Sequence, residues 1–148
     1  MDFFEAGTSV SFLILVAKYS AFYMLGVILI VQFIHYPSFL AVSSNHFSEF
    51  HQRHSNWMSI LVGPVMVLEL LTGLLLVLKS PDPFFSMLTW VNLVLVILTW
   101  LSTFLISVPI HNRLAIQANQ KDIQNLIKTN WLRTILWSAK AILLSVFL

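Results

Sequence analysis

The sequence predicts an all-α integral membrane protein whose helices form a four-helix bundle. Of its 148 residues, 58% are hydrophobic and only 9% are charged, whereas an ordinary soluble domain has about a quarter charged residues. The mean hydropathy is +0.86. Four apolar segments meet or approach the ~20 residues that a helix needs to cross a bilayer core of ~30 Å. These observations exclude a soluble enzyme, a DNA-binding domain and a disordered linker.

The four predicted spans follow one another in a single domain, residues 1–148. They cover about residues 10–35, 58–78, 84–110 and 132–148. The first span is interrupted only by Lys18 and Gln32. Residues 79–83 contain two prolines, which end helices on both sides, so we expect a tight turn between spans two and three.

The two other connections are longer and differ in composition. Residues 36–57 are rich in Ser, His and Phe, so we expect them to lie on the membrane surface and to be partly helical. Residues 112–130 alternate apolar residues with Gln, Asn and Lys. This pattern is typical of an amphipathic helix that lies in the membrane interface, and we expect one between spans three and four.

The distribution of basic residues predicts the orientation. Five of the eight Lys and Arg residues lie in the two longer connections or at the start of span four: Arg53, Arg113, Lys121, Lys128 and Arg133. By the positive-inside rule, both longer connections are cytoplasmic and both termini lie outside a bacterial-type inner membrane. The expected environment is therefore the lipid bilayer. A net charge of +2 is too small for a nucleic-acid-binding surface.

Two ionisable residues lie near the centres of predicted spans, Glu69 in span two and Lys140 in span four. An isolated charge there costs at least ~2.5–3.5 kcal/mol, so the simplest hypothesis is that the two form an ion pair. The pair has two interpretations. It fixes the order of the helices, or Glu69 carries a proton or anchors a polar ligand together with Lys140.

All five histidines fall on the predicted cytoplasmic side. His35 ends span one and His111 ends span three, so these two, together with His54, Arg113 and Arg133, are expected to line one shared mouth. His51 and His54 are three residues apart, a spacing that suits a metal ion. Because the chain has no cysteine, the candidate metals are haem iron, copper and non-haem iron. A metal-free acid–base or quinone-like site and a structural role stay open.

Several short motifs resemble a known family. Val108-Pro-Ile-His-Asn-Arg-Leu-Ala115 closes span three, and Trp131-Leu-Arg-Thr134 opens span four. Both resemble motifs of the anthrone-oxygenase-like family of small four-helix membrane proteins. Phe33-Ile-His-Tyr-Pro-Ser-Phe39 is similar to a wider group that includes copper-resistance-type and membrane protoporphyrinogen-oxidase-type proteins. The chain departs from the family where only Leu132 separates Trp131 from Arg133, since the family often has a His there. The resemblance implies a four-helix membrane fold.

Three functional hypotheses follow. The first is a small redox-type membrane protein whose His-lined cytoplasmic-side pocket takes a haem, a metal, or an apolar aromatic or quinone-like ligand. Its acid–base groups or ligands are His35, His54 and His111, and its groups for anionic or carbonyl oxygens are Asn112, Arg113 and Arg133. The second is a non-catalytic accessory or scaffold subunit, with a homo-oligomer or another membrane protein as partner. The third is a proton-coupled carrier that uses Glu69 and Lys140. Whether the chain is an enzyme stays open.

Overall fold

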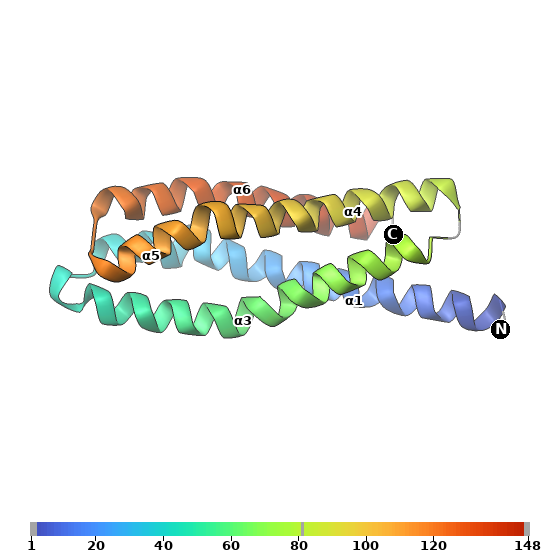
Figure 1. Ribbon diagram of the computed structural model, residues 1–148, viewed down its shortest axis with the longest axis horizontal. Helices are drawn as coiled ribbons and strands as arrows, with labels where there is room; N and C mark the ends of the chain where they lie inside the picture. Colours follow the sequence, from blue (N-terminus) through green and yellow to red (C-terminus); the bar gives the residue numbers. More distant parts are fainter. Residues whose placement is uncertain (1–2, 81, 147–148) are drawn as a thin grey trace.

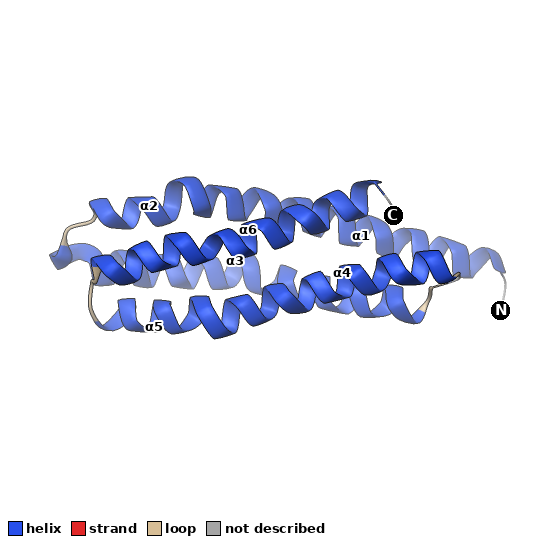
Figure 2. Cartoon of the chain, turned by 90° about the horizontal axis from the view of Figure 1, so that it is seen from above, coloured by secondary structure: helices blue, strands red, loops and turns tan. Residues whose placement is uncertain are grey.

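The computed structural model describes residues 3–80 and 82–146, and these residues form helices with no strand among them (Figure 2). The all-α prediction is therefore confirmed for the described part of the chain. The elements in chain order are α1 (Phe3–Ile30), the π-helix η1 (Val31–His35), α2 (Tyr36–Ser38), the 3₁₀ turn η2 (Phe39–Ala41), α3 (Ser44–Leu78), α4 (Pro83–Ser102), the π-helix η3 (Thr103–Ser107), α5 (Val108–Ile116) and α6 (Gln120–Val146).

The long helices lie side by side along one axis (Figure 1). Helix α1 packs against α3 and α6, and α4 also packs against both, so the four contacts close a ring around a common interior. Elements α4, η3 and α5 follow one another as one continuous rod, as do α1, η1 and α2. The interior of this ring holds the buried side chains that form the candidate site.

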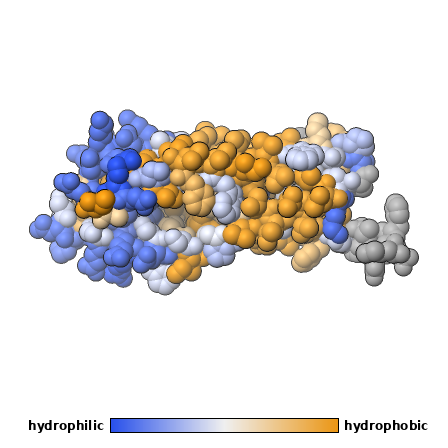
Figure 3. All heavy atoms as spheres, in the orientation of Figure 1, coloured by the Kyte–Doolittle hydropathy of each residue, from blue (hydrophilic) through white to orange (hydrophobic). Residues whose placement is uncertain are grey.

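Three of these rods are long and apolar enough to cross a membrane, namely Ser9–Ala41, Ser44–Leu78 and Pro83–Ile116. This result confirms the membrane class, and apolar side chains cover the middle of the molecule on the face shown in Figure 3. Helix α6 is not among the three, because Arg133 and Lys140 lower its hydropathy. The last two residues of the expected fourth span, 147–148, lie outside the described residues.

One end of the molecule, formed by residues 36–57 and 111–130 and here called the polar end, carries most of the hydrophilic surface visible in Figure 3. At 1.5 Å per residue, α3 is about 50 Å long, so it extends well beyond an apolar core of ~30 Å. The segment expected to lie on the membrane surface is instead mostly the first four turns of α3. The polar end is thus a continuation of the helical rods.

The expected interfacial helix in residues 112–130 is not seen as a separate element. Helix α5 ends at Ile116 and α6 begins at Gln120, so the amphipathic segment is divided between two long rods. Its apolar side chains Ile123 and Leu126 are buried in the same core cluster as Phe39 and Phe47. These side chains pack against other helices of the bundle. The segment is therefore part of the helical rods and does not lie across them.

The two π-helical segments occupy equivalent positions in their rods. Pro37 lies two residues after η1, and Pro109 lies two residues after η3. A proline inside a helix lacks the N–H group and clashes with the carbonyl four residues earlier, which favours a wider preceding turn, although α3 continues through Pro64 without a π segment. Single-turn π segments occur frequently at functional sites. Here both lie at the level where the apolar rods meet the polar end.

Helices α3 and α4 lie in close contact at Gly73. A Cβ atom there would lie 3.3 Å from Asn92 Nδ2 and 3.4 Å from Leu93 Cδ1, whereas a Cβ at Gly26 would meet nothing within 4 Å. Replacing Gly by Ala inside a helix stabilises it by about 1 kcal/mol. We expect Gly26→Ala to raise the free energy of unfolding by this amount. The free energy of unfolding of Gly73→Ala should be about 1–2 kcal/mol lower than that of Gly26→Ala, because Asn92 and Leu93 must move. Thermal unfolding in detergent, followed by circular dichroism, measures the difference. Equal midpoints for the two variants would contradict the close α3–α4 contact.

Candidate functional site

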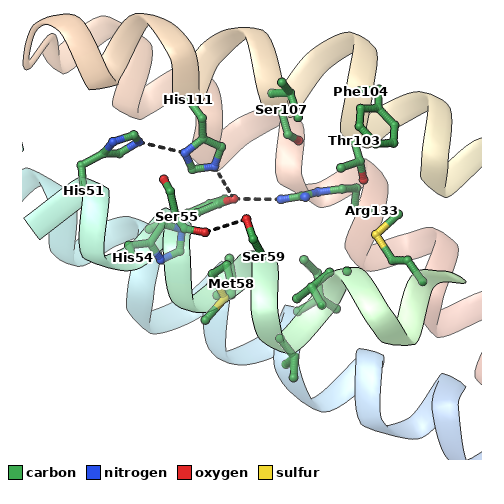
Figure 4. A pocket seen from close by; sticks show the side chains of 18 of the residues that line it. His51, His54, Ser55, Met58, Ser59, Thr103, Phe104, Ser107, His111 and Arg133 are labelled. Carbon is green, nitrogen blue, oxygen red and sulfur yellow. Dashed lines mark hydrogen bonds between the residues drawn. The ribbon is translucent and has the colours of Figure 1, made fainter. Parts of the chain in front are cut away.

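A cavity of about 600 Å³ lies inside the polar half of the helix ring, between α1, α3, η3, α5 and α6. We call it the inner cavity. Its deeper wall is apolar, with Met24, Val27, Ile28, Val31, Met66 and Phe104. Its polar side chains gather toward the polar end and come from three different rods: His51, His54, Ser55, His111 and Arg133 (Figure 4). This combination of an apolar wall and a few convergent polar groups is typical of a small-molecule site.

Arg133 is the central charge of the inner cavity. Its side chain is 7% exposed. The guanidinium donates to Asn130 Oδ1 at 3.0 Å and to Tyr36 Oη at 2.9 Å, and Asn130 Nδ2 in turn donates to Gln32 Oε1 at 2.9 Å. No carboxylate among the side chains that the structure describes, those of residues 9–80 and 82–146, pairs with Arg133. A buried cation without an acidic partner is costly, so its retention beside a cavity indicates a functional role.

A chain of hydrogen bonds leads from Arg133 to the histidines. Because Arg133 only donates, the hydroxyl hydrogen of Tyr36 is available to His111 Nε2, 3.0 Å away. A neutral His111 with its proton on Nδ1 then donates to His51 Nε2 at 2.9 Å, which leaves the remaining proton of His51 on Nδ1. That Nδ1 atom is buried and has no partner among the described residues. The four side chains form a continuous hydrogen-bonded chain, part of which Figure 4 shows. Arg133 stays protonated at one end of it, so Tyr36, His111 and His51 are the three members that can act as a proton relay.

His54 and His35 continue the imidazole cluster on the other side of His111. The rings of His54 and His111 are stacked with centroids 5.5 Å apart, and those of His35 and His54 are 4.4 Å apart. His54 Nδ1 and His35 Nε2 are both buried, and neither has a hydrogen-bond partner within the described chain. The sequence predicts that His35, His54, His111, Arg113 and Arg133 line one shared mouth. The rings of His35, His54 and His111 do lie together, but of the five residues only His54, His111 and Arg133 line the inner cavity.

The geometry does not favour the predicted metal ligands. The ring centroids of His51 and His54 are 6.5 Å apart, and His51 Nε2 is bonded to His111 instead of facing His54. In the parts of the chain that the structure describes, no group of three or more His, Cys, Asp or Glu side chains is placed to hold a metal ion. Of the four imidazoles, His51 and His111 are joined by a hydrogen bond, and His111 is also bonded to Tyr36.

The remaining predicted ligand-binding residues separate into two groups. Asn112 lines the inner cavity. Arg113 does not line it: its side chain is 53% exposed and pairs with Asp122 at 2.8 Å across the turn between α5 and α6. The Arg113 guanidinium holds the pKa of the Asp122 carboxyl below its usual range, chiefly through their hydrogen bonds. The role of Arg113 is thus to join two helices.

Glu69 and Lys140 form the expected ion pair, with 2.6 Å between Lys140 Nζ and Glu69 Oε1. Both side chains are buried, at 2% and 1% exposure. Neither lines the inner cavity, but Trp137 connects the two sites: its indole forms part of the cavity wall, and Trp137 Nε1 donates to Glu69 Oε2 at 3.1 Å. The ion pair therefore holds one wall residue of the cavity in place.

The sequence analysis did not identify Tyr36, Gln32 and Asn130 as members of the site. Tyr36 joins Arg133 to His111, and the two amides fix the Arg133 guanidinium. The position of Tyr36 could have indicated its role, because Tyr36 lies between His35 and Pro37 at the end of a predicted span. Such a position is also ordinary for an interfacial tyrosine.

The inner cavity thus combines an apolar wall, one buried guanidinium, a tyrosine hydroxyl and three imidazoles, those of His51, His54 and His111. Comparison of the chain with protein-family models, curated proteins and solved structures finds no match. Its function is therefore inferred from this chemistry.

Proposed function

We propose that this chain is a small redox-type membrane protein that binds an apolar, aromatic carbonyl compound of the quinone class in the inner cavity. The observation that carries the proposal is Arg133, a buried cation without a described acidic partner at the polar end of a cavity whose opposite wall is apolar. A carbonyl or phenolate oxygen is the ligand group that such a guanidinium attracts. The apolar wall accommodates the rings.

The relay gives the proposal its chemistry. A quinone that gains two electrons also takes up two protons, and the residues here supply the protons. Arg133 and Tyr36 hold the ligand oxygen, while His111 passes a proton between Tyr36 and His51. A neutral imidazole accepts a proton on one nitrogen and releases one from the other, so the relay works in either direction. The electrons come from a membrane partner.

The membrane arrangement that we infer has four spans, with α6 as the fourth. Support comes from its packing against both α1 and α4 and from Lys140, whose charge is neutralised by Glu69 inside the ring. The excess of Lys and Arg at the polar end favours a cytoplasmic position for that end, in a bacterial-type inner membrane with both termini outside. This arrangement agrees with the resemblance to the anthrone-oxygenase-like family, which remains part of the proposal.

Binding of menadione, a small naphthoquinone, tests the proposal. We expect saturable binding at one site per chain, measured by isothermal titration calorimetry on protein purified in mild detergent. Gly63 lines the inner cavity, and a Cβ atom there would meet nothing within 4 Å. A leucine at this position therefore fills the cavity without disturbing the helices. We expect Gly63→Leu to weaken binding at least about tenfold, a loss of ~1.4 kcal/mol.

Gly26→Leu is the matched control, because Gly26 also has open space around its Cβ position but does not line the inner cavity. This variant is expected to bind menadione as the unmodified chain does. Absence of saturable binding to the unmodified chain would refute the quinone proposal and favour the accessory-subunit hypothesis. Equal binding by all three proteins would place the ligand elsewhere.

A further inference from the structure

A second pocket, of about 540 Å³, opens on the outer side of α3 at the polar end. We call it the outer pocket. Its lining includes His46, Glu49, Arg53, Trp57 and Met58, all from one face of the first four turns of α3. His54 lines both pockets and so separates the outer pocket from the inner cavity. Met58 also lines both pockets, whereas His46, Glu49, Arg53 and Trp57 line the outer pocket alone.

The outer pocket lies at the boundary between water and lipid. After Trp57, α3 is almost entirely apolar as far as Leu78, whereas the residues before it are mostly polar. The Trp57 side chain is 60% exposed, and exposed tryptophans are enriched at the level of the lipid headgroups. Arg53, one turn before Trp57, therefore faces the headgroup layer, which is roughly 5–7 Å thick on each side of the apolar core. Glu49 lies one turn farther out, at the outer edge of that layer or just beyond it.

The pocket presents two opposite charges in a fixed order. Arg53 lies one helical turn above Trp57, and Glu49 lies one turn above Arg53, about 6 Å per step. Both side chains are exposed, and neither forms an ion pair or hydrogen bond with the other or with another described residue. Side chains four apart on a helix are close enough to pair, so both charges remain available to a ligand that presents the complementary charges.

The floor of the pocket is formed by two imidazoles, those of His35 and His54. Their ring centroids lie 4.4 Å apart, and His54 is 6% exposed. His54 Nδ1 and His35 Nε2 are both shielded from solvent. The groups that the pocket offers to a ligand are therefore the charges at its rim.

We propose that the outer pocket binds the headgroup of a phospholipid with a primary ammonium group, of the phosphatidylethanolamine class. The phosphate of such a lipid lies nearer the acyl chains and meets Arg53, and its ammonium group lies farther out and meets Glu49. The acyl chains descend past Trp57 and Met58. A phosphatidylglycerol offers no cation to Glu49, and a phosphatidylcholine offers a cation without N–H donors, so the pocket favours the primary amine.

Native mass spectrometry of the detergent-purified chain with equal amounts of dioleoyl phosphatidylethanolamine, phosphatidylglycerol and phosphatidylcholine tests this proposal. We expect the ethanolamine lipid to give the strongest one-to-one adduct. Glu49→Gln removes the partner of the ammonium group and is expected to abolish the preference, which corresponds to about tenfold weaker binding of the ethanolamine lipid alone. Arg53→Gln removes the partner of the phosphate and weakens all three adducts.

Lys121→Gln is the matched control, because it removes another exposed cation of the polar end that lies outside the pocket; its adducts should equal those of the unmodified chain. Equal binding of the three lipids, or an unchanged preference in Glu49→Gln, would overturn the proposal. So would competition by soluble phosphoethanolamine as effective as that of the lipid, since a free headgroup would then suffice. A dimer that replaces the lipid adducts would assign the pocket to a second copy of the chain.

Discussion

Lys140→Met is expected to lower the free energy of unfolding by about 3–5 kcal/mol, the usual cost of leaving one member of a buried ion pair without its partner. The Glu69 carboxylate is 2% exposed, and after this change its only hydrogen-bond donor among the described residues is the Trp137 indole. Unfolding by SDS in mixed micelles, followed by circular dichroism, measures the loss. An unfolding midpoint equal to that of the unmodified chain would show that the pair contributes nothing.

The double variant Glu69→Gln/Lys140→Met separates a structural pair from a functional one. It removes both charges and keeps an acceptor for Trp137 Nε1, so most of the lost stability should return, to within about 1–2 kcal/mol of the unmodified chain. If the pair only fixes the helices and the Trp137 wall, this variant also keeps its affinity for menadione. Loss of binding in a variant of restored stability would favour the carrier hypothesis, in which Glu69 and Lys140 act on the ligand.

The ion pair also shows which parts of the structure are predictable from sequence. Two opposite charges near the centres of different spans must pair, because the bilayer core offers no alternative to either one, and the structure places them 2.6 Å apart. The meeting of His35, His54 and His111 follows equally from topology, since their helix ends lie on one side. Only 9% of the residues are charged. Each charged residue inside a predicted span therefore has few possible partners, and its partner can be predicted.

The local rotation of the helices was not predictable in the same way. Arg113 and Arg133 are the same residue type at the same end, yet only Arg133 faces the inner cavity. The π segment η3 precedes Arg113 and inserts about one residue into the helical repeat, which turns everything after it by roughly 100°. A prediction that assumes a regular helix of 3.6 residues per turn does not include this rotation. The amphipathic pattern around Ile123 and Leu126 likewise fits either a membrane surface or a helix bundle, and only packing decides between them.

Arg133→Met is expected to weaken menadione binding by about 30- to 100-fold while leaving the free energy of unfolding within about 1 kcal/mol of its original value. The loss of affinity corresponds to one hydrogen bond to a charged group, about 2–3 kcal/mol. Stability changes little because two effects oppose each other. Removing a buried cation without an acidic partner is favourable, and the acceptors Asn130 Oδ1 and Tyr36 Oη lose their donor, which is unfavourable.

Two further variants make this prediction specific to Arg133. Arg133→Lys keeps the charge but cannot reach Asn130 and Tyr36 with a planar fork, so its affinity should fall between those of the unmodified chain and Arg133→Met. Arg113→Met removes the exposed guanidinium that pairs with Asp122 outside the inner cavity, and its dissociation constant for menadione should not change. Loss of binding in Arg113→Met, or none in Arg133→Met, would mean that charge at the polar end, and not the buried guanidinium, attracts the ligand. Arg133 is a buried cation held only by neutral acceptors, Asn130 Oδ1 and Tyr36 Oη, so ligand binding gains from its charge although the charge adds little to stability.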